Sequence, residues 1–372
     1  MRRMNTILIT LAVMLAACGG NDPLPDPPKP DAEVKWEISP ATTVFTDKGE
    51  TKNIVVTANG DWTVTSGQNW CSLTPDKGGN GQTLLKVTAT ANPQTTTRTA
   101  ELTFSAGKQN QKYTVTQEGA TVENYVPAGY TLAWADEFDA VRTAGGKPAL
   151  PDTQKWWYET AGPGWVNNEL QTYVKDFSGT DTVAAIYDGT LKIIAKKQNQ
   201  KIISARINSS KSWTYGYFEA RLRVPGGKGT WPAFWMLPEK ENLNWPLDGE
   251  IDIMEYVGYD PGWIHSSVHT NAYNHTIGTQ KTAKKEIKTA ETQFHIYAVE
   301  WTASYIKGFV DGVEYFRFNN DGAGNKETWP FNVPFYLKLN LAWGGNWGGA
   351  QGVDESKLPA TYEIDWVRVY QK

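Results

Sequence analysis

Three carboxylates lie close together in residues 248–257, whose sequence is DGEIDIMEYV. Glu250 and Asp252 alternate with two isoleucines, which is the period of two of a β-strand. Strict alternation would turn Glu255 toward the apolar side of that strand. A β-bulge with Met254 as the extra residue returns it to the side of the other two. The pattern therefore predicts three carboxylates on one strand face; a solvated acidic face is the alternative.

Carboxylates held together drive their pKa values apart. One ionised and one protonated carboxylate are the groups that break a glycosidic bond, because one attacks the anomeric carbon and the other protonates the leaving oxygen. The middle carboxylate, Asp252, can hydrogen-bond its neighbours. The sequence spacing alone does not decide whether the two carboxyl groups have the separation of a retaining or of an inverting glycosidase. The flanking segments GTWPAFWMLP and SSVHTN are rich in residues suited to a cleft.

Aromatic residues are abundant, with 17 Trp, 17 Tyr and 12 Phe in 372 residues. They fit either a large β-rich core or a cleft in which rings stack on sugars. The formal net charge of −4 indicates no nucleic-acid partner. The length predicts about two domains.

Residues 1–17 have the basic start, apolar run and small-residue ending of a signal peptide, and the run is too short for an ordinary membrane span. The ending LAAC resembles a bacterial lipobox, which implies cleavage before Cys18 and acylation of its thiol; an incidental cysteine is the alternative. Residues 18–34, rich in Pro and Asp, predict an extended tether. Cys71 then has no disulfide partner in the mature chain and is interpreted as a buried small hydrophobe.

Short alternating strands with Asn-Gly and Asn-Pro turns fill residues 35–119 and predict a small antiparallel sandwich. The pattern NGDWTVTSGQNWCSLTPDKGGNG, followed by RTAELTFSAG and VTQEG, resembles the BACON domain. That resemblance implies an immunoglobulin-like module, which we expect to be a spacer that lifts the next domain off the membrane. Trp62 and Trp70 lie inside strand patterns, so core positions are favoured over a sugar platform.

Residues 120–372 also show strand patterns and predict one large all-β sandwich or a barrel. Asp311 and Gly312 between two alternating runs predict a tight hairpin. The segment KTAKKEIKTAETQ is too polar for a buried helix and is predicted to be a loop or a sheet edge.

This second region resembles glycoside hydrolase family 16. GEIDIMEYVG matches its E-x-D-x-x-E signature with the bulge residue, and WADEF, NNELQTYV, SWTYGYFEARLRVPGGKGTWPAFWMLP, HIYAVEWTASYIKGFVDG, PFYLKLNLAWGGNWGG and IDWVRVYQ are similar to laminarinase-type members. The resemblance implies a β-jelly-roll sandwich with an open cleft and endo-acting, retaining hydrolysis. It implies Glu250 as nucleophile, Glu255 as general acid/base and Asp252 as assisting carboxylate.

The resemblance also implies a set of substrate-binding residues. Trp231 and Trp235 would line subsites beside the nucleophile. Trp343 and Trp347 would either rim the cleft or pack under it. Contacts with sugars or with the catalytic carboxylates would come from Asn168, Glu169, Arg206 and His269, the last of which has a core histidine as its alternative.

No cofactor is expected for catalysis. The resemblance implies a structural calcium ion on the outer face, matched by Glu137 in DEF and Asp365 in EIDW. Either residue could as easily be a surface carboxylate.

NNELQTYV together with GTWPAFWMLP looks most like enzymes that cut β-1,3-glucan (laminarin) or mixed-linkage β-1,3/1,4-glucan, and this resemblance implies an endo-β-1,3(4)-glucanase. A monomer is expected. Enzymes of galactans and mucin O-glycans share the bulged motif and are the alternative, although no run of Lys or Arg appears near the motifs. An inactive glycan-binding protein is the non-enzymatic alternative, and the presence of all three carboxylates argues against it. A large polymer substrate favours an outer-membrane lipoprotein exposed at the cell surface, attached by its lipid anchor only.

Overall fold

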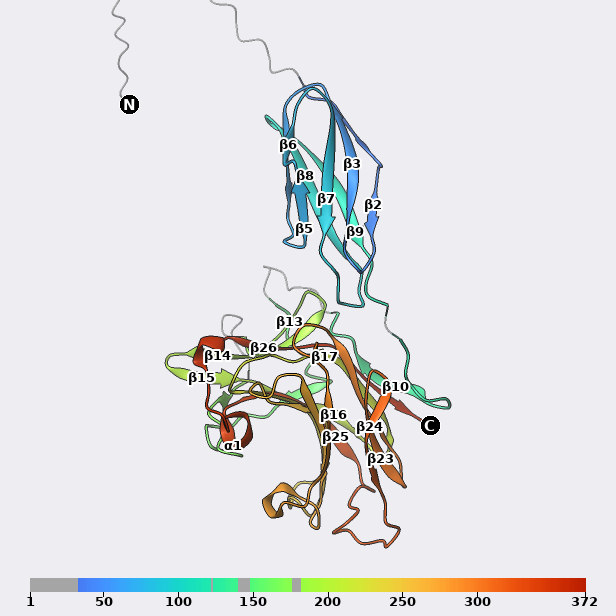
Figure 1. Cartoon of the computed structure of the whole chain (residues 1–372), viewed down its shortest axis with the longest axis vertical. Coiled ribbons are helices and arrows are strands. Elements are labelled where there is room, and N and C mark those ends of the chain that lie inside the picture. Colours follow the sequence, from blue (N-terminus) through green and yellow to red (C-terminus); the bar gives the residue numbers. More distant parts are fainter. Residues whose placement is uncertain (1–32, 122, 140–147, 176–181) are drawn as a thin grey trace, which may run out of the picture.

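The computed structural model describes residues 33–121, 123–139, 148–175 and 182–372. The expected signal peptide, Cys18 and most of the tether lie outside the described residues. The described chain is almost entirely β-strand and forms two sandwiches, one standing above the other in Figure 1. Within this part, no helix has both the length and the apolar character that a membrane crossing requires.

The N-terminal sandwich consists of a four-stranded and a five-stranded sheet. Its core contains Trp62 and Cys71, each 2% exposed, which confirms both as core residues. Trp70 is partly buried against the same core, and the guanidinium of Arg98 lies 4.4 Å from its ring centroid. The first sheet has the order β1 (Trp36–Ser39), β3 (Glu50–Ala58), β7 (Gly81–Ala89), β5 (Cys71–Thr74), and the second β2 (Thr43–Phe45), β9 (Gln109–Gln117), β8 (Arg98–Ala106), β4 (Trp62–Ser66), β6 (Lys77–Gly78).

The C-terminal sandwich pairs a ten-stranded outer sheet with a seven-stranded inner sheet, so it is a sandwich and not a barrel. The inner sheet has the order β11 (Trp156–Tyr158), β16 (Arg206–Trp213), β25 (Phe335–Trp343), β18 (Thr230–Pro238), β19 (Glu250–Tyr256), β20 (Trp263–His269), β21 (Lys281–Glu286). The outer sheet contains β10 (Thr131–Asp136), β12 (Thr172–Tyr173), β13 (Ala184–Tyr187), β14 (Thr190–Gln198), β15 (Lys201–Ser204), β17 (Gly216–Arg223), β22 (His295–Trp301), β23 (Tyr305–Val310), β24 (Val313–Asn319) and β26 (Ala360–Gln371). Short helical turns are η1 (His275–Ile277), α1 (Gly345–Gly348) and η2 (Glu355–Lys357).

Two local predictions are confirmed. Asp311 and Gly312 both have positive φ, 48° and 73°, and turn β23 directly into β24. This is the backbone that a two-residue hairpin needs, and Asn, Asp and Gly are the residues that adopt it most easily. The start of the polar segment KTAKKEIKTAETQ forms β21, the edge strand of the inner sheet.

Side-chain alternation on the strands places the core between the two sheets. On β25 the odd-numbered residues Phe335, Leu337, Leu339, Leu341 and Trp343 are fully buried in that core. The even-numbered residues therefore point to the opposite, concave face of the inner sheet. This is the face onto which the three carboxylates of β19 also project, as described below.

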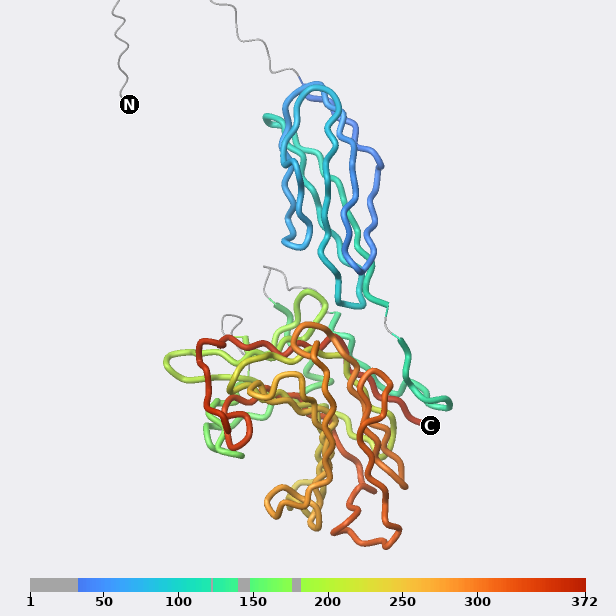
Figure 2. The backbone as a smooth tube through the Cα atoms, in the orientation of Figure 1, coloured from blue at the N-terminus to red at the C-terminus, as the bar shows by residue number. Residues whose placement is uncertain are grey.

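The N-terminal sandwich contacts the outer sheet on its solvent side, away from the concave face. Arg221 on β17 donates to the carbonyl of Pro93 at 2.7 Å, and Thr95 donates to the carboxylate of Asp365 on β26 at 3.3 Å. Figure 2 shows that the described chain enters this sandwich at the end remote from the C-terminal one. The whole core thus separates the N-terminal module from the cleft.

Gly258 follows β19 at a point where backbones approach closely. A Cβ there would lie 2.0 Å from the carbonyl oxygen of Gly227 and 2.3 Å from Oγ1 of Thr230. Gly258→Ala is therefore expected to destabilise the protein by about 2 kcal/mol or more, a loss of about 5 °C or more in melting temperature by thermal denaturation. Gly162→Ala, where an added Cβ meets nothing within 4 Å, is the control and should melt within about 2 °C of the wild type.

Candidate active site

A bulge in β19 sets the direction of the three carboxylates. Asp252 pairs with Ser267 of β20 and Glu255 with His265, so two residues of β19 stand opposite one of β20. The predicted bulge is therefore confirmed, but its extra residue is not the predicted Met254. Against β18, Met254 pairs with Phe234 and Ile253 is the residue without a partner. Both side chains are fully buried in the core, which leaves Glu255 on the concave face.

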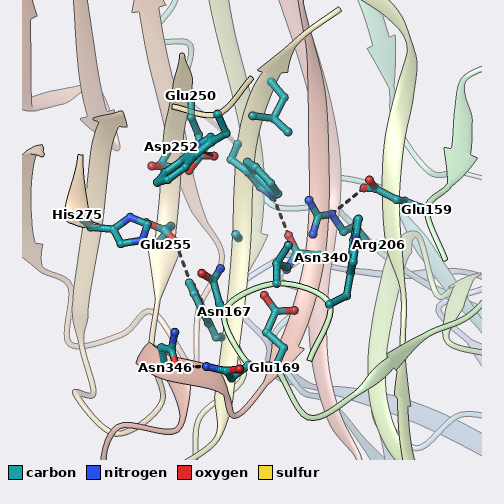
Figure 3. Close-up of a pocket in the computed structure, with 18 of the residues that line it drawn as sticks. Glu159, Asn167, Glu169, Arg206, Glu250, Asp252, Glu255, His275, Asn340 and Asn346 are labelled. Atoms are coloured by element: carbon teal, nitrogen blue, oxygen red, sulfur yellow. Dashed lines mark hydrogen bonds and ion pairs between the residues drawn. The ribbon is translucent and has the colours of Figure 1, made fainter. Parts of the chain in front are cut away.

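The carboxylates open into a cleft of about 560 Å³ on the concave face. Figure 3 shows Glu250, Asp252 and Glu255 together on one side of this cleft, with Arg206 and Glu159 opposite. Asp252 is the deepest of the three at 2% exposed. The remaining lining is mainly aromatic and amide: Trp165, Asn167, Asn168, Glu169, Trp231, Trp235, Leu243, Trp245, His275, Asn340 and Asn346.

Burial disfavours the charged form of all three acids. It raises the pKa of Glu250 to about 8, with the nearby Asp252 as the next cause, and the pKa of Glu255 to about 7. Burial and the neighbouring Glu255 raise the pKa of Asp252 well above its usual range. The raised pKa values mean that the site holds protons at neutral pH, as a general acid requires.

Both glutamates of the cluster receive an indole hydrogen bond. Nε1 of Trp231 donates to Glu255 at 3.0 Å, and Nε1 of Trp245 donates to Glu250 at 3.0 Å. Trp231 and Trp235 both line the cleft. Because β18 runs antiparallel to β19, Trp235 pairs with Asp252, whereas Trp231 lies at the Glu255 end and not at the Glu250 end. The neighbour of Glu250 is Trp245, from the loop before β19.

The Trp231 hydrogen bond lowers the pKa of Glu255, since it favours the charged form. In Trp231→Phe that pKa should rise, and the alkaline limb of the kcat/KM profile should move to higher pH by ~0.5–1 unit, the equivalent of a hydrogen bond of ~1 kcal/mol. The measurement is a pH–rate profile on a soluble glucan. Trp235→Phe, which loses a bond to Asn340 instead, should keep the wild-type alkaline limb.

His269 lies beside the acids and not in the core. Its Nε2 atom is 3.2 Å from Asp252 and 3.9 Å from Glu250. The rings of Trp245 and His275 pack at centroid distances of 6.0 and 5.2 Å from it. Such packing holds the imidazole where it lowers the pKa of Glu250 and of Glu255.

Opposite the acids, a buried ion cluster supports the cleft floor. Glu159 accepts from Nζ of Lys338 at 2.8 Å and pairs with Nε of Arg206 at 2.8 Å. The Arg206 guanidinium lies 4.7 Å from the ring centroid of Trp235, and Lys338 lies 5.0 Å from it. Nε1 of Trp235 donates to Asn340 at 2.7 Å. The cluster therefore fixes the orientation of the Trp235 ring.

The NNEL segment closes one end of the cleft. Asn168 donates to Asn346 at 2.8 Å, which ties this loop to α1. The carboxylate of Glu169 accepts from Gln171 at 2.7 Å and from Tyr173 at 3.0 Å. Both predicted residues line the cleft, although Glu169 is 6% exposed and its carboxylate is already engaged by the protein.

Trp343 is not a substrate contact, which corrects the sequence-based prediction. Its side chain is fully buried in the core, because β25 turns its odd-numbered residues inward. Trp347, four residues further along the chain, is half-buried, and its ring meets the cleft-lining Trp231 edge-on at 5.5 Å and His265 at 5.0 Å. Of these two tryptophans, Trp343 therefore packs in the core, whereas Trp347 packs against a residue that lines the cleft.

The carboxylates implied to bind calcium do not fit a cation. Glu137 accepts two hydrogen bonds from Arg368, each 2.8 Å, and Asp365 accepts one from Arg221 at 2.7 Å. Each of these carboxylates is thus paired with a guanidinium, whose positive charge opposes a cation at the same place. Among the described residues, the acidic and histidine side chains close enough to share a metal are Glu250, Asp252 and His269, which belong to the carboxylate cluster of the cleft.

Several lining residues were missed from the sequence. Trp245 precedes the acidic strand by five residues, and its position in NWPLDGE was the one available signal. Glu159 and Lys338 are 179 residues apart and meet only through strand pairing. His275 and Asn346 reach the cleft from short helical turns that no strand periodicity marks.

A two-sheet sandwich with a carboxylate cluster between tryptophans defines the site of a glycosidase. Residues 171–368 match the model of "Glycosyl hydrolases family 16", and residues 35–120 match "Viral BACON domain". A "Beta-glucanase" of Rhodothermus marinus is 45% identical over 65% of this chain and 85% of its own. The chain belongs to glycoside hydrolase family 16.

Solved structures agree. The laminarinase from Rhodothermus marinus is 44% identical, covers 65% of this chain and 97% of its own, and has a TM-score of 0.60. A mutant of SCLam, described as a non-specific endo-β-1,3(4)-glucanase and co-crystallised with 1,3-β-D-cellotriosyl-glucose, is 42% identical over 66% of this chain and 96% of its own, with a TM-score of 0.61. The predicted β-jelly-roll sandwich is thus confirmed.

Proposed function

We propose that this protein is a retaining endo-β-glucanase that hydrolyses β-1,3-glucan and mixed-linkage β-1,3/1,4-glucan. The observation that carries the proposal is the bulged strand β19, which presents Glu250, Asp252 and Glu255 together in an open, tryptophan-lined cleft. The printed activities of the similar proteins, a β-glucanase, a laminarinase and an endo-β-1,3(4)-glucanase, support this substrate class.

The reaction proceeds in two displacements. Glu250 attacks the anomeric carbon, and Glu255 gives its proton to the leaving oxygen, which departs as the hydroxyl of the released chain. Glu255, now ionised, takes a proton from a water molecule. The resulting hydroxide attacks the glycosyl–Glu250 ester, frees the sugar with its original anomeric configuration and restores both acids.

Asp252 prepares Glu250 for attack. Its raised pKa keeps a proton on Asp252, and the charge that would repel ionised Glu250 is then absent. His269 and Arg206 both lower the pKa of Glu250, and the indole N–H of Trp245 donates to its carboxylate. These contacts favour the ionised form of Glu250 and oppose the burial that raises its pKa to about 8. The reaction starts from the state in which Glu250 is ionised and Glu255 is protonated.

The lining of the cleft favours a neutral glucan over a sulfated galactan. Among the described residues that line the cleft, Arg206 is the only lysine or arginine. Glu159 already pairs with its guanidinium at 2.8 Å. A sulfate ester would have to compete with that carboxylate. Tryptophan faces and amide groups, in contrast, suit uncharged sugar rings.

The test is product analysis of the purified protein and of Glu250→Gln on laminarin, barley mixed-linkage glucan, agarose and mucin glycans. Oligosaccharides released from a glucan by the wild type alone support the proposal. Cleavage of only agarose or mucin glycans would keep the mechanism and replace the substrate. Binding without cleavage of any of the four would identify a surface glycan-binding protein instead.

We further propose that the chain is a monomeric lipoprotein held at the outer cell surface by acylated Cys18, with the N-terminal sandwich as spacer. Support comes from the entry of the chain at the far end of that sandwich and from the contacts of Arg221 and Thr95, which fix it behind the cleft. Cys18→Ser should move the protein from the membrane to the soluble fraction. Resistance of the wild type to protease added to intact cells would argue for the periplasmic face.

A further inference from the structure

An aromatic pair lies on the concave face beyond the cleft described above. Trp157 on the edge strand β11 is 43% exposed, whereas its neighbour Trp156 is 1% exposed and belongs to the core. The Trp157 ring lies 6.1 Å from the ring of Tyr336 on β25 at an interplanar angle of 47°. With 43% of its surface exposed, the indole leaves part of its ring open to a ligand.

The pair is continuous with the cleft floor. Nζ of Lys338 lies 5.0 Å from the ring centroids of both Tyr336 and Trp235, so one buried ammonium links the two rings. Tyr336 is also the Cα partner of Leu237 across the β25–β18 pair. Because Trp235 and Leu237 line the cleft, a glycan leaving the cleft in this direction passes directly onto Tyr336 and Trp157.

The register shows which part of a bound chain would arrive there. Tyr336 pairs with Leu237, and the adjacent Met236 pairs with Ile251, so Tyr336 is level with Glu250. Trp157 pairs with Asn208, and that row continues through Lys338 and Trp235 to Asp252. The platform as a whole is therefore nearer in register to Glu250 than to Glu255. From β19 to β11 the inner sheet spans four strand spacings, ~19 Å. Sugars on the Glu250 side belong to the portion that becomes bonded to the nucleophile, which is the non-reducing side of the cleaved linkage.

We propose that Trp157 and Tyr336 form a distal sugar-binding platform that takes a β-glucan chain several units to the non-reducing side of the cleaved bond. This platform rests on the proposed glucanase function. It makes the enzyme prefer long chains, because only they fill the cleft and the platform at once. Flat aromatic faces bind the apolar C–H faces of pyranose rings, and no charged group is needed for this recognition.

The experiment compares Trp157→Leu, which keeps apolar bulk without a ring, with Trp157→Phe, which keeps a ring. With laminarin, Trp157→Leu should raise KM by about fivefold at unchanged kcat, and Trp157→Phe should stay within about twofold of the wild type. With laminaritriose, both variants should match the wild type. Unchanged KM on laminarin in Trp157→Leu overturns the platform, and so does an equal loss on both substrates, which would indicate a structural role.

Binding is measured separately by affinity electrophoresis in laminarin-containing gels, with Glu250→Gln as the parent so that no hydrolysis occurs. Retardation of this parent should weaken when Trp157→Leu is added. If laminarin is hydrolysed but retardation is unaffected by Trp157→Leu, the platform is overturned and the glucanase proposal stands. If laminarin is neither bound nor hydrolysed, both proposals fall.

Discussion

Glu250→Gln is expected to lower kcat on laminarin by about 10⁴-fold or more, because an amide cannot form the glycosyl ester. The substitution preserves the shape of the side chain, and the Trp245 indole at 3.0 Å can still donate to the amide oxygen. The melting temperature should therefore stay close to that of the wild type. Reducing-sugar release together with thermal denaturation measures both quantities.

A smaller side chain at the same position tests the role more directly. In Glu250→Ala, azide can enter the vacated space and attack an activated β-glucoside from the face that the carboxylate used. The product should be a glucosyl azide of inverted anomeric configuration. A loss of less than about 100-fold in Glu250→Gln, or an azide product of retained configuration, would show that Glu250 is not the nucleophile.

Glu255→Gln is expected to affect substrates according to their leaving groups. General acid catalysis contributes about 10²–10⁴-fold, so hydrolysis of laminarin should fall by that factor. An aryl β-glucoside whose phenol leaves without protonation should form the glycosyl-enzyme nearly as fast as with the wild type. The second step lacks its base, so a burst of phenol followed by slow turnover is the expected time course by stopped-flow absorbance.

The alkaline limb provides an internal control for this assignment. Wild-type activity should fall above about pH 7, as Glu255, whose pKa burial raises to about 7, loses the proton that it must donate. In Glu255→Gln that limb should be absent from the burst phase. Equal losses on laminarin and on the aryl glucoside, with the alkaline limb retained, would assign the general acid to another residue.

The order of strands along the chain and the carboxylate strand itself are determined by local sequence. Period-two alternation marks β19, and the spacing of Glu250, Asp252 and Glu255 places all three on one face only with a bulge, which is how the sequence predicted one. Turn chemistry likewise placed the Asp311-Gly312 hairpin. These features depend on neighbours along the chain, which a sequence displays directly.

Which residue occupies the bulge, and which tryptophan meets which acid, depends on pairing between strands. The register against β18 leaves Ile253 unpaired instead of Met254 and sets Trp231 beside Glu255. One step of alternation on β25 turns Trp343 into the core, although its sequence neighbours suggested the cleft. A single-residue change of register reverses every side chain of a strand, so such assignments cannot be predicted without the partner strand.

The residues on the side of the cleft opposite the acids come together only in the tertiary structure. Glu159 and Lys338, separated by 179 residues, meet under Trp235 because β11, β16 and β25 are neighbours in the inner sheet. Arg221 and Arg368 reach the carboxylates that the sequence assigned to calcium for the same reason. The sequence thus displayed the three carboxylates proposed to do the chemistry, whereas long-range strand pairing decided what surrounds them. A side chain's partners across a sheet are set by register and not by distance along the chain.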